Sequence, residues 1–476
     1  MTRALLVVGL GLGDEGKGSV VDALVRRHGA SSVVRFNGGP QAAHHVVSPE
    51  GQLHCFSQFG AGTLVPGVRT HLARFVAVDP LALAREDAAL RALGVDDAMA
   101  RLSVDPRCVV VTPVHRALNR IRELVRGDAR HGSVGLGVGE ALLDAEGAAV
   151  PSVRVGDARD PVRLGATLRL LWRMKIDLAE QLVGGARGAG IEHAAIDREL
   201  STLRRREPIE QLAAALEHLV HASVATLAEG PAMGADEVTI FEGAQGVLLD
   251  RDHGFFPYVT PSRTTLANAN ALLAEAAWAG SSTRVGVLRA YATRHGQGPF
   301  VTEDAALTAA TPDLHNAAHA FQGGFRVGWF DLVAARYAIR VVGGVDWLAI
   351  TNLDRLAGLE SVKVCTAYES DEGREVLRDL PLGEGAASVS FEARAALTAR
   401  LSRCRPVYSE FPGWRSASDP AAEAFLRFLE SPAALGTPVG MASWGPRAGE
   451  KSYFAATGDL NATPGIATGQ GTRSWA

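Results

Sequence analysis

The chain has 476 residues, of which 47% are hydrophobic and 21% charged, and its formal net charge is −4. This length fits one large α/β domain or two to three smaller ones. The charge balance is that of an ordinary globular protein and lacks the basic field of a nucleic-acid-binding protein. The four cysteines show no C-x-x-C spacing, and neither a signal peptide nor a run of 18 apolar residues is evident, so we expect a cytoplasmic protein without membrane or nucleic-acid partners.

The first predicted strand leads through a glycine loop into a helix, and residues 7–25 read VVGLGLGDEGKGSVVDALV. The spacing fits neither a P-loop nor a dinucleotide fingerprint, because Asp14 and Glu15 stand where a pyrophosphate would want only backbone N–H donors. An anion-binding loop that keeps an acid is expected to use it for a metal ion or a proton. Lys17, one of four lysines against 44 arginines, supplies a compact ammonium for phosphate.

The second predicted strand, SSVVRF at residues 31–36, is followed by a glycine pair and then by His44 and His45. Neighbouring residues of an extended segment point to opposite sides, so at most one of these histidines faces a given site. Taken alone, each also fits an ordinary hydrogen-bonded or surface histidine.

Strand-like and helical segments alternate along the remaining chain. Strands are predicted at FVAVD, CVVVTP, EVTIFEG, TRVGVLRAYA, VDWLAITNLD and LESVKVCTAY, and helices over 161–183, 197–228 and 264–279. This order predicts an α/β fold with a central, mainly parallel sheet flanked by helices. We expect a single large domain over 1–476, P-loop-like in that a glycine loop follows its first strand, although the spacing of that loop is not a P-loop's. We expect loops at 184–192 and 380–389, and a tail at 455–476 that lies on the surface or is partly mobile.

Two strand ends carry polar residues that suit a site. EVTIFEG ends in Glu242, followed by Gly243, Ala244 and Gln245, at the place where α/β sheets hold site residues. The segment AITNLD is similar to the guanine-reading N-K-x-D of GTPases, although as an isolated motif it is weak.

Together these segments resemble the adenylosuccinate synthetase family, GTP-dependent enzymes of purine metabolism. Residues 13–18, GDEGKG, match the family's opening motif. RFNGGPQAAHHVV resembles R-[YF]-x-G-G-x-N-A-G-H-T, FEGAQGVLLDRDHGFFPYVT resembles F-E-G-A-Q-G-x-L-L-D-x-D-x-G-x-x-P-x-V-T, and LRAYATRHGQGPFVTE resembles K-A-Y-x-T-R-V-G-x-G-P-F-P-T-E. GWFD, TNLDRLAGL, PVYSEFPGW and SWGPR follow in the family's order, so the resemblance covers nearly the whole chain.

The resemblance implies a mechanism in which Asp14 removes the N1 proton of a 6-oxopurine and the 6-oxygen attacks the γ-phosphate of GTP. His44 assists as a general acid, Gln245 donates a hydrogen bond near the 6-position, and an amine then displaces the phosphate. The implied cofactor Mg²⁺ would be held by Asp14 and the carbonyl of Ala43. The implied nucleotide-binding residues are Gly13, Glu15, Gly16, Lys17, Gly18, Asn352, Asp354, Ser443, Gly445 and Pro446.

The amine-donor site departs from the family. The family's aspartate loop reads A-T-T-G-R-R-R-R-x-G-W. Aligned without gaps, this chain has HAFQGGFRVGW, in which Gly323, Gly324 and Phe325 replace three arginines. Arg326 remains, and Gln322 is a further polar candidate for the amine donor. Removing arginines that face a buried carboxylate costs about 2 to 5 kcal/mol each, so aspartate is either held by other residues or is not the donor.

The acceptor site departs as well. The implied acceptor-binding residues are Gln41, Ser133, Val134 and Thr260, but Gln41 replaces an Asn of the family, Val134 removes a hydroxyl, and the arginine that the family lends across its dimer is missing. Asn352 also replaces the lysine of the guanine motif. Three interpretations stay open: synthesis of adenylosuccinate with the substrates held by different residues, joining of another acceptor and amine, or a nucleotide-binding protein without catalysis. From the resemblance we expect a homodimer that uses small-molecule substrates.

Overall fold

We analysed a computed structural model of the chain. It describes residues 2–147, 149–186, 191–221, 226–234, 237–313, 323–370, 375–382 and 390–454. The tail 455–476 and most of the loop predicted at 380–389 therefore lie outside the described residues. Among the helices that the structure describes, none is both long and apolar enough to cross a membrane.

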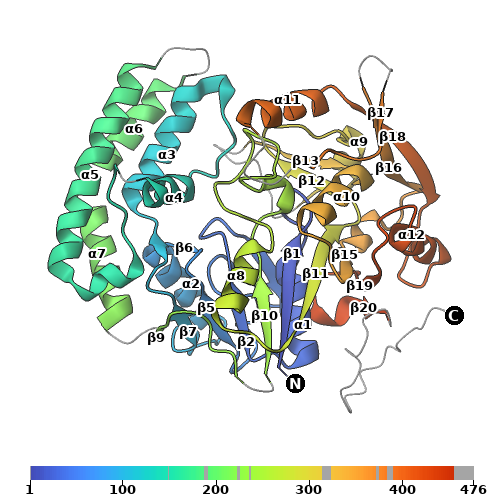
Figure 1. The fold of residues 1–476 in the computed structure, drawn as a ribbon, viewed down its shortest axis with the longest axis horizontal. Coiled ribbons are helices and arrows are strands. Elements are labelled where there is room, and N and C mark those ends of the chain that lie inside the picture. The colour runs from blue at the N-terminus through green and yellow to red at the C-terminus, as the bar shows by residue number, and fades with distance from the viewer. Residues whose placement is uncertain are drawn as a thin grey trace.

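A ten-stranded sheet runs through the described part of the chain (Figure 1). Its order is β20-β19-β15-β11-β1-β10-β2-β5-β7-β9, and every pair is parallel except β19 with the edge strand β20. The strands are β1 (Arg3–Gly9), β2 (Ser32–Arg35), β5 (Arg69–Leu72), β7 (Leu102–Val104), β9 (Thr226–Leu227), β10 (Val238–Glu242), β11 (Ser281–Arg289), β15 (Trp347–Thr351), β19 (Val439–Ser443) and β20 (Lys451–Tyr453). The predicted α/β class with a mainly parallel central sheet is confirmed.

The central strand β1 shows why this sheet forms. Its side chains alternate between two apolar cores, with Leu5 and Val7 packed in one and Leu6 and Val8 in the other. A parallel sheet is covered on both faces, so its strands read as continuous apolar runs. The run ALLVV therefore specifies a strand at the centre of the sheet.

Helices cover the sheet and also build a lobe beside it. The helices that lie with the sheets are α1 (Lys17–His28), α2 (Pro80–Ala92), α8 (Ala267–Glu275), α9 (Ala305–Ala310), α10 (Leu332–Val341), α11 (Phe391–Leu401) and α12 (Pro420–Glu430). The green and cyan lobe at the left of Figure 1 contains α3 (Pro113–Arg126), α4 (Val138–Glu146), α5 (Pro161–Gly184), α6 (His193–Arg204) and α7 (Glu207–His221).

The helix predicted over 197–228 is two helices, and the prediction is wrong at its end, where Thr226–Leu227 form strand β9. Helix α6 ends at Arg204, and α7 begins at Glu207. Pro208 lies in the first turn of α7, where its missing N–H leaves no bond unmade, whereas inside a continuous helix it would remove a hydrogen bond and clash. The proline therefore sets the break.

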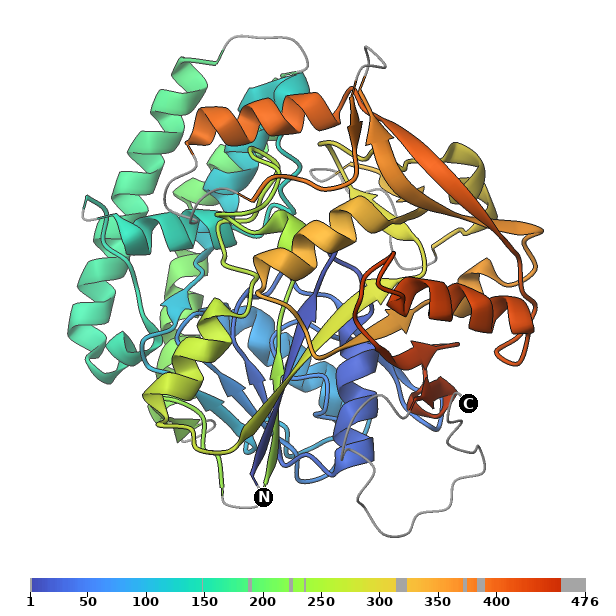
Figure 2. The ribbon, with the colours of Figure 1, turned by 45° about the vertical axis from the view of Figure 1, so that its right-hand side comes forward.

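Smaller sheets complete the fold. Strand β16 (Ser361–Glu369), predicted from LESVKVCTAY, is outside the central sheet and pairs with β14 (Phe330–Asp331), β17 (Val376–Leu377) and β18 (Arg405–Pro412). In Figure 2 the orange strands β16 and β18 stand at the upper right, apart from the central strands. The remaining pairs are β3 (His44–Val47) with β4 (Leu53–Phe56), β6 (Ala77–Val78) with β8 (Val109–Val110), and β12 (Ala292–His295) with β13 (Phe325–Gly328).

Candidate active site

Several of the predicted site residues lie on segments at one end of the central sheet. The loop after β1 lies beside the segments that follow β10, β11 and β15, since β1 pairs with β10 and β11, and β11 pairs with β15. All of these strands are parallel, so their carboxyl ends meet at one edge, where α/β folds hold ligands.

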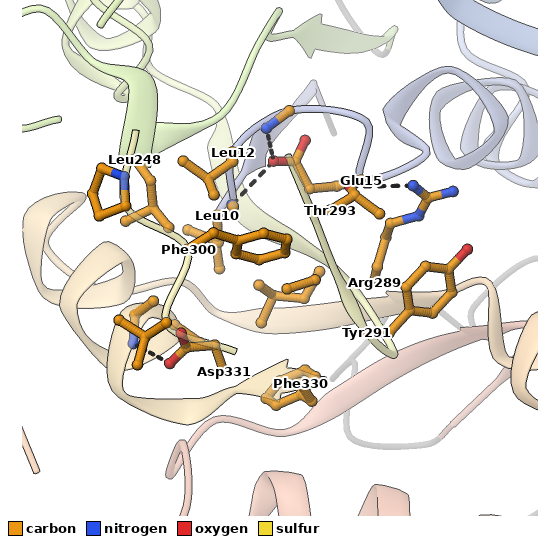
Figure 3. Close-up of a pocket in the computed structure, with 18 of the residues that line it drawn as sticks. Leu10, Leu12, Glu15, Leu248, Arg289, Tyr291, Thr293, Phe300, Phe330 and Asp331 are labelled. Atoms are coloured by element: carbon orange, nitrogen blue, oxygen red, sulfur yellow. Dashed lines mark hydrogen bonds between the residues drawn. The ribbon is translucent and has the colours of Figure 1, made fainter. Parts of the chain in front are cut away.

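Glu15 organises the loop from inside. Its Oε1 accepts hydrogen bonds from the backbone N–H of Gly11 at 3.0 Å and of Gly13 at 2.8 Å, and its Oε2 accepts one from the ammonium of Lys17 at 2.5 Å. Glu15 and Lys17 are both buried. Figure 3 shows the Glu15 carboxylate reaching back to the loop backbone. Glu15 therefore fixes the loop's shape and holds the ammonium in place.

The loop ends at the amino terminus of α1. The residue before the helix, Gly16, has φ of 82°, and no side chain caps the helix there. The hydroxyl of Thr351, the last residue of β15, donates to the Glu15 carbonyl at 2.6 Å. The uncapped N–H groups of the first turn, next to Lys17, form a site suited to phosphate.

Asp14 stands at the most unusual backbone position of the loop. Its φ is 59°, a left-handed conformation that Asp tolerates better than most residues. Its Oδ2 lies 2.7 Å from Nε2 of His295. Burial raises the pKa of Asp14, but the hydrogen bond and charge of His295 and the charges of Arg289 and Lys17 hold it below its ordinary value. Asp14 is therefore an ionised carboxylate, available to accept a proton.

His44 is held by a buried carboxylate. Its Nδ1 lies 2.5 Å from Oε1 of Glu242, whose Oε2 accepts from the Ala61 N–H at 2.9 Å. Burial lowers the pKa of His44 to about 4, against the opposing charge and hydrogen bond of Glu242, so the ring is neutral in the free protein. A Cβ on Gly18 would lie 2.8 Å from Cβ of His44, so glycine lets the histidine approach α1.

Gln245 and Thr260, which belong to the same motif but lie 15 positions apart, are in contact. The Gln245 amide Nε2 donates to the Thr260 hydroxyl at 3.1 Å, and Gln245 has a φ of 63°. Its Oε1 is buried and has no hydrogen-bond partner within the described residues. A buried polar atom without a partner is unusual in a native protein, and here it suits contact with a ligand.

The segments expected to bind the nucleotide base also meet, because β15 and β19 are parallel neighbours. Asn352 and Asp354 follow β15, while Ser443, Gly445 and Pro446 lie at the end of β19 and just after it. Burial raises the pKa of Asp354, opposed by the charges of Arg355 and Lys451. The ammonium of Lys451 donates to the Gly445 carbonyl at 2.5 Å, so a lysine lies in this segment although Asn352 replaces the family's lysine.

The loop with Ser133 and Val134 lies between the helical lobe and the segment around Thr260. The rings of His131 and Tyr258 are 6.4 Å apart. The Ser133 hydroxyl donates to Asn119 at 2.9 Å, and the N–H groups of Gly132 and Ser133 donate to the buried carboxylate of Glu123. The polar groups that the loop offers are therefore largely bound by protein. Gln41 keeps a buried Oε1 without a partner among the described residues, and Ala43 is exposed.

The predicted donor-binding residue Arg326 is engaged by the protein itself. Its guanidinium donates to Glu303 at 2.6 Å and to the carbonyls of Gly296 and Gly298 at 2.6 and 3.1 Å. The neighbouring Arg294 donates to the carbonyls of Gln297 and Pro299. Neither arginine is aimed at an open carboxylate site. Gln322 lies outside the described residues.

An apolar cavity of about 60 Å³ lies under the loop, bordered by Leu10, Leu12 and Leu248 and closed by Phe300 and Phe330 (Figure 3). Drug-sized ligands need pockets of about 300 to 1,000 Å³. This cavity is too small for a nucleotide, so it is not itself the nucleotide site.

The residues present fit a magnesium ion bound mainly through phosphate and water. The described residues contain no cluster of three or more His, Cys, Asp or Glu that could hold a metal. Mg²⁺ needs oxygen ligands and is typically held by one or two protein groups plus substrate phosphates. The ionised Asp14 beside a phosphate-binding loop satisfies that requirement.

Sequence reasoning gave no role to two residues of this site. Glu242 is predicted at a strand end that suits a site, but not as the partner of His44. His295 lies in the segment LRAYATRHGQGPFVTE, where the family has valine, and that departure could have identified it. Both contact residues far away in the sequence, so their partners become evident only in the folded chain.

Comparisons with known proteins bear on this site. The family model described as adenylosuccinate synthetase matches residues 6–451. Adenylosuccinate synthetase of Mycobacterium tuberculosis (strain ATCC 25618 / H37Rv) is 33% identical over 459 residues, covering 93% of this chain and 96% of that protein. The fully ligated adenylosuccinate synthetase of Plasmodium falciparum has a TM-score of 0.72 at 20% identity, covering 94% of this chain and 99% of that one. A cyanophage S-2L succinoaminodeoxyadenylate synthetase bound to dGMP and dATP has a TM-score of 0.54 at 16% identity, covering 95% of each chain.

Proposed function

The chain belongs to the adenylosuccinate synthetase family of GTP-dependent ligases that form C–N bonds, and we propose that it keeps the family's phosphoryl-activation chemistry with altered pockets for acceptor and amine. The acceptor is a 6-oxopurine nucleotide such as IMP, or a related nucleoside, and the donor is aspartate or another amine. The observation that carries this proposal is the convergence of Asp14, Lys17, His44 and Gln245 at one edge of the sheet.

In the proposed reaction Asp14 is the base. Its ionised carboxylate takes the N1 proton of the acceptor, and the electron pair released makes the 6-oxygen a better nucleophile toward the γ-phosphate. An oxygen leaves poorly as hydroxide but well as phosphate, so one difficult substitution becomes two easier steps. Gln245 donates near the 6-position, and the amine then displaces the phosphate.

We assign His44 the role of general acid in the same transfer. Glu242 fixes the ring through Nδ1, so Nε2 is the nitrogen assigned to the phosphate. The ring is neutral in the free protein because burial lowers the pKa of His44 to about 4. A bound anionic phosphate next to Nε2 would raise this pKa, since a nearby negative charge favours the imidazolium. His44 is therefore expected to gain its proton as the nucleotide binds.

GTP and Mg²⁺ fit the loop. The uncapped start of α1 and the ammonium of Lys17 would hold the phosphates, and Asp354 would read the base. Asp14, with the Ala43 carbonyl, would hold Mg²⁺, which supplies charge neutralisation at the phosphates when bound. Asn352 stands where the family has lysine, and Lys451 supplies a nearby cation.

The altered pockets support substrates other than IMP with aspartate. Arg326 and Arg294 are bound to protein acceptors, and Val134 replaces a hydroxyl residue of the family's acceptor loop. A donor carboxylate would therefore need other partners. The cyanophage enzyme with the same fold is bound to dGMP and dATP, which illustrates that this fold serves more than one nucleotide pair. We further propose a cytoplasmic homodimer acting on small molecules as one domain.

The first test is mass spectrometry of a reaction of the purified protein with Mg²⁺, GTP, IMP and aspartate, with phosphate release followed in parallel. Adenylosuccinate would show that other residues replace the lost arginines. GTP binding without product would direct a screen of other acceptors and amines. A tight nucleotide complex without turnover for any pair would favour a binding protein and contradict the proposal.

The role of Asp14 is tested with Asp14→Asn. Asn tolerates the left-handed backbone at this position and keeps the side-chain shape, but it cannot take a proton. We expect phosphate release to fall at least 1,000-fold, of the order that general base catalysis supplies together with charge, while GTP still binds. Turnover unchanged within twofold would refute the assignment.

A further inference from the structure

His295 lies at the end of β12 and bonds to the proposed base. Its Nε2 is 2.7 Å from Oδ2 of Asp14, across 281 positions of the sequence. Both side chains are mostly buried, with 18% of His295 and 28% of Asp14 exposed. Among the described residues, His295 is the one that the structure shows hydrogen-bonded to the Asp14 carboxylate.

The other charged groups near Asp14 are engaged elsewhere. Lys17 donates to Glu15 at 2.5 Å. Arg289 donates to the Thr293 hydroxyl at 3.2 Å, lies 3.7 Å from Asp313 and packs over the Tyr291 ring. Their charges reach Asp14, but neither orients its carboxylate by a hydrogen bond. The orientation of the carboxylate therefore depends on His295.

Two departures from the family motifs meet at this histidine. The family has valine at the position of His295, and Phe325 stands where the ungapped family loop has arginine. The two residues are directly opposite in the β12–β13 pair, and their rings are 4.9 Å apart at 56°. Phe325 thus packs against the imidazole and restricts its rotation, and one change accompanies the other.

The chemistry of the two groups identifies the donor. A carboxylate without a proton can only accept, so the hydrogen of this contact lies on Nε2 of His295 and is donated to Asp14. Nδ1, the other ring nitrogen, is buried and has no partner within the described residues.

We propose that His295 is a positioning residue that fixes the Asp14 carboxylate through Oδ2 and so orients it toward the acceptor, a role that rests on the proposed function. The family's valine has no N–H, so this device is specific to chains with histidine here. A base fixed within hydrogen-bond geometry transfers its proton more efficiently than one that rotates freely. His295 itself need not touch the acceptor.

The test compares His295→Val, which restores the family residue, with His295→Gln. Gln carries an N–H donor the same number of bonds from Cβ as Nε2 of histidine. We expect His295→Val to lower kcat about 10- to 100-fold, the range of a hydrogen bond to a charged group, with KM for GTP changed less than threefold. His295→Gln should recover most of the loss. His71→Val, which removes another strand histidine bonded to Ser103, is the control and should keep kcat.

A kcat within twofold of the parent in His295→Val, or a His295→Gln protein as slow as His295→Val, would overturn the proposal. If the parent protein releases no phosphate with any substrate, the proposed function fails first. The contact is then decided by melting temperatures of His295→Val, Asp14→Ala and the double variant. The contact is supported if the melting-temperature shifts of the two single variants do not add up in the double variant and if His295→Gln restores the melting temperature of the parent. Additive shifts overturn it.

Discussion

Three of the four lysines in this arginine-rich chain are buried beside oxygen acceptors. Lys17 pairs with Glu15, Lys175 with Asp144 at 2.6 Å, and Lys451 with the Gly445 carbonyl. A guanidinium is larger and planar, and its five donors need more acceptors than these sites provide. A compact ammonium therefore suits these three sites better than a guanidinium would, and Lys17 at the end of the loop after β1 is one of them.

Glu242 is the residue on which the orientation of His44 depends. In Glu242→Gln the amide oxygen would still accept from the Ala61 N–H, so the NH₂ group would face Nδ1 of His44. It would oppose the imidazolium, which carries a hydrogen on both ring nitrogens and is the form that the general acid needs. We expect kcat for phosphate release to fall about 10- to 100-fold, with GTP affinity retained. Stopped-flow phosphate release measures kcat, and nucleotide titration measures the affinity for GTP.

Glu237→Gln is the matched control for that variant. Glu237 lies just before the other end of the same strand, β10, where it pairs with Ser31 and Arg69 at the surface. It should leave kcat unchanged. Equal losses in the two variants would mean that Glu242 acts through the stability of the strand and does not orient His44.

At the scale of elements, the site depends on how closely α1 approaches β3. In Gly18→Ala the new Cβ would lie 2.8 Å from Cβ and 2.9 Å from the carbonyl carbon of His44, closer than such atoms pack. The backbone of β3 cannot move aside as a flexible side chain would. We expect kcat to fall more than 10-fold and the melting temperature to drop, as measured by phosphate release and thermal unfolding.

Gly184→Ala is the control for this helix substitution. Gly184 ends α5, and a Cβ there would have no atom within 4 Å, so the change should be neutral or raise stability by up to about 1 kcal/mol. Full activity in Gly18→Ala would contradict the packing argument.

At the scale of the whole molecule, buried histidines make stability depend on pH. Burial lowers the pKa values of His28, His54 and His71 to about 4. Between pH 6.5 and 4 the unfolded chain binds more protons than the folded one. The contribution of these histidines to the free energy of unfolding is therefore complete above pH 6.5 and is lost as the pH falls toward 4. Between pH 7 and pH 5 each of these histidines lowers the free energy of unfolding by about 2 kcal/mol.

Two buried carboxyls act in the opposite sense. Burial raises the pKa of Glu86 to about 7 and of Asp331 to about 6, so their protonation on acidification favours the folded chain. The net expectation is a lower melting temperature at pH 5 than at pH 7.5, with a smaller difference in His71→Val. An equal difference in that variant would show that His71 does not contribute.

The sequence alone determined the fold class and the family. Apolar runs such as ALLVV specify buried parallel strands, and GDEGKG marks the phosphate loop, because both are local patterns. The tertiary structure decided which residues act together. His44 meets Glu242 across 198 positions, and Asp14 meets His295 across 281. Such pairs form because the parallel strands bring distant loops to one edge of the sheet, and no local pattern encodes which loops become neighbours or which side chains then share a proton.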